Sequence, residues 1–185
     1  SRLRRRRLAA LVERGARGVA RASRSDAGPR RPSGSHGAGR STMTEPVGPW
    51  RCAACGFSQA QPIARLRVST LALYDDARFP GRAVLVLDEH ATLLEDLPLA
   101  TARDLALDVR RAALAVRAAA GAARVNYAVF GNVVPHVHVH LIPRHGPWDR
   151  APRATAWDHP EPERPLGPGE AARRIDAIRH ALREP

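Results

Sequence analysis

Residues 126–144, NYAVFGNVVPHVHVHLIPR, are the most informative stretch of this chain. Its centre alternates histidine with valine, so that His136, His138 and His140 occupy every second position. Alternate side chains of an extended chain share one face, so we expect a strand with its histidines about 6 to 7 Å apart on one face and Val137 and Val139 facing a core. Histidine changes charge near neutral pH, so such a row suits nucleophilic, acid–base or metal chemistry.

The flanking sequence predicts an antiparallel sheet with one long helix. We expect strands at residues 68–74 and 83–87, joined as a hairpin, and further strands at 125–130 and 137–142. Apolar residues at helical spacing predict a helix over 102–120 that ends at Gly121, with Thr101 and Asp104 as a capping box. A shorter amphipathic helix is expected over 170–182. Strands without parallel β–α–β alternation favour an α+β fold.

Charge is concentrated at one end of the chain. The 185 residues contain no lysine, and residues 1–42 hold twelve arginines against Glu13 and Asp26, which is +10 of the formal net charge of +12. The remainder is therefore nearly neutral, and a nucleic-acid partner is not expected. No apolar run is long enough to span a membrane, so we do not expect a membrane partner.

Residues 1–42 lack the apolar content that a folded core needs. They fit an organelle transit peptide or a basic arm that binds nucleic acid or anionic lipid. We favour a third interpretation, a misassigned start, because Met43 is the only methionine. We accordingly divide the chain into an Arg-rich extension at 1–42, a principal domain at 43–150 and a Pro-rich C-terminal segment with a short helix at 151–185.

The run HVHVHLIPR, together with Asn126, the Gly131-Asn132 pair, GRAVLVLDEH and the helical segment between them, resembles the histidine triad (HIT) hydrolases and transferases. The resemblance implies an α+β fold of the HIT type, with a five-stranded antiparallel sheet, a long helix and a C-terminal helix. It also implies a homodimer. The expected activity is that of a nucleotide hydrolase or transferase, on substrates such as diadenosine polyphosphates or nucleoside phosphoramidates.

The resemblance also implies roles for individual residues. His138 would attack the α-phosphorus of a nucleotide to form a nucleotidyl-histidine that water hydrolyses, and His140 would hydrogen-bond the phosphate or the leaving-group oxygen. No catalytic metal is required for this chemistry. Asn126, Gly131 and Asn132 match positions that contact phosphate or the bridging oxygen, and Asp75 or Asp76 would meet the ribose hydroxyls. Turn formation is the alternative role for these asparagines and aspartates.

Cys52 and Cys55 have the C-x-x-C spacing of a zinc knuckle, or of a reduced or redox-active pair. Cysteines this close suit a reducing compartment, and we expect a cytoplasmic protein. A structural zinc needs four ligands. In zinc-bearing members of the resembled family the other two match His90 and His136, so we predict a structural zinc site there.

Two departures from the family pattern leave the substrate open. Arg82 stands where many members carry histidine, and Val133 stands where many carry a hydroxyl residue near phosphate. They also leave open a regulatory protein that binds nucleotide without turnover. A further alternative is a metalloenzyme with His136, His138 and His140 as catalytic ligands.

The remaining polar and aromatic residues of the C-terminal part are expected to have ordinary roles. We expect His145, His159 and His180 to be solvated and Arg144 to be exposed. Trp148 and Trp157 are expected to serve packing or a dimer contact rather than substrate binding.

Overall fold

The computed structural model describes residues 48–146, 149 and 151–184. The predicted extension at 1–42 lies outside the described residues. The chain order is β1 (Trp50–Arg51), β2 (Ser58–Gln59), β3 (Pro62–Arg65), β4 (Ser69–Leu73), β5 (Ala83–Leu87), α2 (Leu99–Ala120), β6 (Arg124–Ala128), β7 (His138–Arg144) and α3 (Glu170–Arg183). The predicted α+β class is confirmed.

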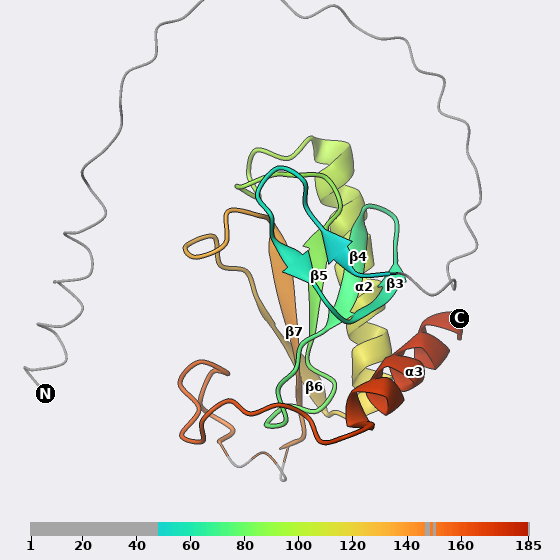
Figure 1. Ribbon diagram of the computed structural model, residues 1–185, viewed down its shortest axis with the longest axis vertical. Coiled ribbons are helices and arrows are strands. Elements are labelled where there is room, and N and C mark those ends of the chain that lie inside the picture. Colours follow the sequence, from blue (N-terminus) through green and yellow to red (C-terminus); the bar gives the residue numbers. More distant parts are fainter. Residues whose placement is uncertain (1–47, 147–148, 150, 185) are drawn as a thin grey trace, which may run out of the picture. The chain divides into compact units, whose positions relative to one another are not determined.

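The five longer strands form one antiparallel sheet in the order β3-β4-β5-β7-β6, while β1 and β2 pair separately (Figure 1). The expected hairpin of β4 and β5 is present, with Leu71 opposite Leu85. β3, which the sequence pattern did not single out, forms one edge of the sheet.

α2 and α3 cover one face of the sheet (Figure 1). Val137, Val139 and Leu141 point into the core on this side, where they join buried residues of both helices such as Val116 and Ile178. We call the opposite face, which carries His138 and His140, the histidine face. The short β1–β2 hairpin packs there, with Trp50 and Phe57 against Ala72, Val84 and Val86.

α2 begins three residues earlier than expected and ends as predicted. Its N-cap is Pro98, and no side chain of the described residues caps it, so the predicted capping box of Thr101 and Asp104 is wrong. At the other end Gly121 adopts φ 59°, a left-handed conformation that glycine reaches without strain, and its N–H bonds to the carbonyl of Ala118.

A buried carboxylate ties α2 to the sheet. Asp108 accepts hydrogen bonds from the backbone N–H groups of Arg67 and Val68 and from the hydroxyl of Ser69. These three donors satisfy a charge that is only 2% exposed and would otherwise be costly to bury. The β3–β4 turn is thereby fixed against the helix.

Candidate active site and metal centre

β7 places two of the three histidines side by side. His138 lies opposite Val86 and His140 opposite Val84 on β5, and their ring centroids are 5.1 Å apart. The predicted alternation holds, because Val137 and Val139 are buried on the helix side. His136 precedes the strand, so the three histidines do not form one row on it.

A backbone carbonyl fixes the tautomer of His138. Its Nδ1 lies 2.7 Å from the carbonyl oxygen of His136. A carbonyl can only accept, so Nδ1 must carry the proton in the neutral ring, and the lone pair is on Nε2. Nε2 is therefore the nucleophilic atom of the neutral ring.

His140 is held neutral by its surroundings. Burial, followed by the positive charge of Arg82 and then by His138, lowers its pKa from 6.5 to about 3. Its Nδ1 is buried and has no hydrogen-bond partner in the part of the chain that the structure describes. At neutral pH this ring can donate or accept one hydrogen bond but carries no charge.

A cavity of about 420 Å³ opens beside both rings, a size that suits a small-molecule ligand. Its polar lining includes His138, His140, Gln59 and Asn132, whereas most of the wall is apolar or aromatic. The full lining comprises Phe57, Gln59, Tyr74, Val84, Phe130, Asn132, Val133, Val134, His138, His140 and Trp157.

The predicted phosphate-contacting residues differ in their distance from this cavity. Asn132 lines it. Asn126 lies on β6 opposite Ile142, on the same face of the sheet as His140, but does not line the cavity. Gly131 is exposed in the loop before Asn132. Their contacts with a substrate stay predictions.

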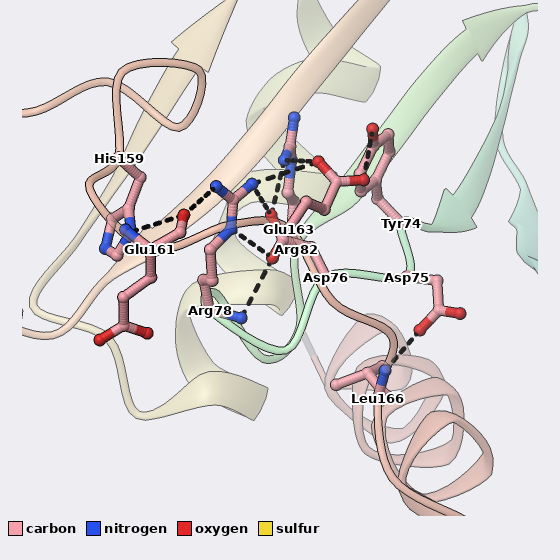
Figure 2. A network of polar contacts seen from close by, with 9 residues as sticks. All are labelled: Tyr74, Asp75, Asp76, Arg78, Arg82, His159, Glu161, Glu163 and Leu166. Carbon is pink, nitrogen blue, oxygen red and sulfur yellow. Dashed lines mark hydrogen bonds and ion pairs between the residues drawn. The ribbon is translucent and has the colours of Figure 1, made fainter.

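The two predicted ribose-binding aspartates bond to the protein itself. Asp75 accepts a hydrogen bond from the backbone N–H of Leu166. Asp76 is fully buried, and its carboxylate is paired with Arg78 and Arg82 (Figure 2). Burial alone would raise the pKa of Asp76, but the hydrogen bonds from both arginines outweigh it and lower the pKa. Neither aspartate lines the cavity.

The four predicted metal ligands meet at one point, although they come from three separate segments. One donor atom from each of Cys52, Cys55, His90 and His136 lies within 4.8 Å of every other. Nδ1 of His90 is 3.3 Å from Nδ1 of His136, and the Sγ atoms lie 3.5 Å and 3.7 Å from a histidine Nδ1. A tetrahedral zinc with ordinary bond lengths separates its nitrogen and sulfur ligands by about 3.3 to 3.8 Å. The cluster is therefore consistent with a structural zinc.

The surroundings of the cluster also fit a metal. Nε2 of His136 lies 2.8 Å from the carbonyl oxygen of Leu87, so Nε2 carries the proton and Nδ1 presents its lone pair to the cluster. The knuckle is closed by hydrogen bonds from the N–H of Cys52 to Phe57 and from the N–H of Gly56 to Cys52. Gly56 has φ 76°, which permits the tight turn between the two cysteines and β2.

Several residues near the site have surroundings that the sequence did not specify. Trp157 lines the cavity, and Arg82 is buried between Tyr74 and Trp157. Arg144, expected to be exposed, is buried and paired with Asp149. His159 is half-buried against Phe79 rather than fully solvated, and Trp148 lies outside the described residues. Strand alternation with Val84 could have placed Arg82 on the histidine face, but no local pattern marks Trp157.

Comparisons with known proteins agree with this geometry. The HIT domain family model matches residues 59–146. A histidine triad protein from Sinorhizobium meliloti has 26% identity and a TM-score of 0.55, over 63% of this chain and 87% of that one. One from Bradyrhizobium japonicum has 25% identity and a TM-score of 0.56, over 65% and 89%. A Zn-bound family member from Mycobacterium smegmatis, at 20% identity and a TM-score of 0.51 over 65% and 82%, shares the fold. No curated protein matches the chain.

Residues 59–146 therefore match the HIT domain, and the chain is similar to histidine triad proteins of known structure. This similarity supports a general role in nucleotide binding or hydrolysis. In the described residues, neither helix combines the length and apolar character needed to cross a bilayer.

The environment of His140 predicts a specific pH dependence of stability. On unfolding, its pKa returns from about 3 to the ordinary 6.5, so between these values the unfolded chain binds one more proton than the fold. His140 should therefore make the fold less stable as the pH falls through this window. We expect the free energy of unfolding of the wild type to fall more steeply between pH about 6.5 and 4 than that of His140→Gln, measured by urea titration.

The comparison between the two proteins removes the contributions of the cysteines and the other histidines, which both share. Parallel pH profiles of stability would show that His140 is not held neutral by the fold.

Proposed function

We propose that this protein is a nucleotide hydrolase or transferase that uses His138 as its nucleophile. The substrate would be a nucleotide with a displaceable group on its α-phosphate, such as a nucleoside phosphoramidate or a diadenosine polyphosphate. The observation that supports this most directly is the hydrogen bond between Nδ1 of His138 and the carbonyl of His136, beside a cavity of suitable size.

The proposed reaction has two displacement steps at phosphorus. Nε2 of His138 forms a bond to the α-phosphorus as the bond to the leaving group breaks. The carbonyl of His136 continues to accept from Nδ1–H and stabilises the positive charge that the ring acquires. Water then displaces Nε2, which restores the neutral histidine and releases a nucleoside monophosphate.

His140 is placed to assist this exchange without being charged. Its ring lies beside that of His138, and its low pKa keeps it neutral at physiological pH. A neutral ring can hydrogen-bond a phosphate or leaving-group oxygen. Asn132, on the cavity wall, is the best placed of the predicted phosphate contacts. In-line phosphoryl chemistry depends mainly on such positioning.

The proposed nucleophile can be tested with a panel of adenylyl and guanylyl phosphoramidates and dinucleoside polyphosphates. We expect the full-length wild type to release nucleoside monophosphate and His138→Ala to lose about a thousandfold or more in rate, because the covalent route is removed. Mass spectrometry of the quenched wild type should show a nucleotidyl adduct on His138. His180→Ala, on the exposed side of α3, is the matched control and should retain activity.

Equal activity of wild type and His138→Ala would disprove the proposed nucleophile. If neither turned over but both bound nucleotide, the chain would be a binding protein. The presence of Arg82 beside His140, in place of the usual histidine, makes this second function worth testing.

We further propose that Cys52, Cys55, His90 and His136 hold a structural zinc. Four protein ligands leave no coordination position open, so the ion would link the knuckle and the end of β5 to the start of β7 rather than take part in the reaction. Support comes from the ligand separations, from the Leu87 carbonyl that orients His136, and from the Zn-bound family member.

The zinc site predicts a defined metal content. We expect about one zinc per chain by elemental analysis, and Cys55→Ser should lose the ion and unfold at a clearly lower temperature, since structural zinc contributes directly to folding. His180→Asn should keep both the metal and the stability. A metal-free wild type whose melting temperature matches that of Cys55→Ser would contradict the proposal.

The third part of the proposal is a homodimer formed through β6. The β3 edge of the sheet is blocked, because Arg179 of α3 donates hydrogen bonds to the carbonyls of Pro62 and Ile63. The other edge, β6, has no neighbour among the described residues and carries Tyr127, which is 56% exposed. An open antiparallel edge with an exposed aromatic favours pairing with an identical strand about a two-fold axis.

Light scattering during size-exclusion chromatography tests this arrangement. We expect the wild type to elute with the mass of a dimer and Tyr127→Arg with that of a monomer, because like charges would face each other across the two-fold axis. Leu99→Arg, at the start of α2 and 86% exposed, should remain dimeric. A monomeric wild type would end the dimer proposal.

A further inference from the structure

Residues 151–166 lie beyond the region matched by the HIT domain model, and they contribute to the cavity beside His140. Two anchors hold this segment. At its start, the guanidinium group of the buried Arg144 donates hydrogen bonds to the carbonyls of Ala151 and Ala154. Next, Ala156 is buried with Phe79 and Ile142.

A second anchor joins the end of the segment to the β4–β5 loop, through the polar network shown in Figure 2. Glu163 accepts from the guanidinium of Arg78 and the hydroxyl of Tyr74. Arg78 also donates to the carbonyl of Glu161. The backbone adds two bonds, from the N–H of Ala77 to the carbonyl of Arg164 and from the N–H of Leu166 to Asp75.

Between these anchors Trp157 is positioned against the predicted catalytic residues. Its ring packs edge-on against His140, with centroids 5.2 Å apart, and against Phe130 at 4.7 Å. The guanidinium carbon of Arg82 lies 5.0 Å from the Trp157 ring centroid and 3.9 Å from that of Tyr74. Three neighbouring side chains therefore define where the indole lies.

Arg82 is a rigid support for this ring. It is 1% exposed and forms ion pairs with Asp76 and, at 3.8 Å, with Glu163, while its Nε and Nη2 have no hydrogen-bond partner among the described residues. A guanidinium group whose N–H groups are only partly hydrogen-bonded is stabilised by cation–π contact with the electron-rich faces of Tyr74 and Trp157. Removing the indole would leave that buried charge less well compensated.

Trp157 nevertheless remains 49% exposed and lines the cavity. Arg82 lies over one face of the indole, and about half of the residue remains open to a ligand. The cavity wall around it includes Phe130, Tyr74 and Val133, so this end is aromatic and apolar. A planar aromatic group would bury apolar surface there and stack on the indole, whereas a small aliphatic group would leave that surface uncovered.

We propose that Trp157 is a specificity-determining residue that stacks an aromatic ring of the substrate, and that Arg82 and Glu163 are positioning residues that hold it. This inference rests on the proposed function, because it assumes that the phosphate lies at His138 and His140. The ring could belong to the nucleobase or to the leaving group. Both groups can present a planar aromatic ring, and the experiment below distinguishes them.

The test compares three phosphoramidates in the full-length protein: adenosine with a benzylamine leaving group, adenosine with a methylamine leaving group, and ribose with a benzylamine leaving group. We expect Trp157→Leu to lower kcat/KM about five- to tenfold for substrates that carry the stacked ring, mainly through KM, and to spare the one that lacks it. Trp157→Phe should recover part of the loss. The substrate that is spared identifies the ring as base or leaving group.

Two variants separate stacking from a loss of structure. Arg153→Ala changes an exposed residue of the same segment and should leave all three substrates unaffected. Glu163→Gln weakens the anchor without touching the cavity and should produce a smaller loss with the same substrate preference. An equal loss with all three substrates in Trp157→Leu, or no loss, would overturn the role of Trp157.

Failure of the proposed function would look different. If the wild type released no product, binding of AMP, of ribose 5-phosphate and of ribose 5-phosphate benzylamidate would be measured by calorimetry instead. Weaker binding in Trp157→Leu of either ligand that carries an aromatic ring, with ribose 5-phosphate unchanged, would retain stacking without catalysis. Unchanged binding of all three ligands would reject stacking.

Discussion

The structure depends on the register of β7 against β5. Val137, Val139 and Leu141 are buried beneath the helices, and His138 and His140 therefore project from the opposite face. A shift of one residue would place imidazoles in the apolar core and expose the valines, so the hydrophobic effect selects one register. The same register aligns the ring of His138 with the carbonyl of His136 and brings His136 to the metal ligands.

The histidine face is completed by parts of the chain that lie far from β7 in sequence. The knuckle contributes Phe57, whose ring centroid is 5.4 Å from that of His138, and the C-terminal segment contributes Trp157 beside His140. Each part is fixed by a polar arrangement: the Cys–His cluster holds the knuckle, and the network around Asp76 holds the C-terminal segment. The cavity is thus lined by aromatic rings from two separately anchored parts of the chain.

Local patterns in the sequence predicted most of the secondary structure. Alternation identified β4 and β7, the turn residues between β4 and β5 identified the hairpin, and helical spacing with Gly121 identified α2 and its end. β3 escaped notice because it is four residues long and begins with Pro62, which an edge position tolerates. The predicted capping box was wrong because the helix begins at Leu99, directly after its N-cap Pro98. Thr101 therefore lies inside the helix and cannot cap it. The burial of Arg144 was not predicted because its partners come after the strand. They are Asp149 and the carbonyls of Ala151 and Ala154, and the strand pattern does not specify where the chain turns.

The sequence by itself determined the α+β class, the alternation that separates valines from histidines, and the C-x-x-C pair, because each is encoded within a few neighbouring residues. The family resemblance added His90 and His136 as partners of the cysteines, and only the tertiary structure brought the four donor atoms together. Only the tertiary structure buried Arg82 between two aromatic rings, turned Asp75 and Asp76 toward the protein, and placed Trp157 beside His140. These contacts join residues many positions apart, and their formation is decided by the packing of whole elements rather than by any local periodicity.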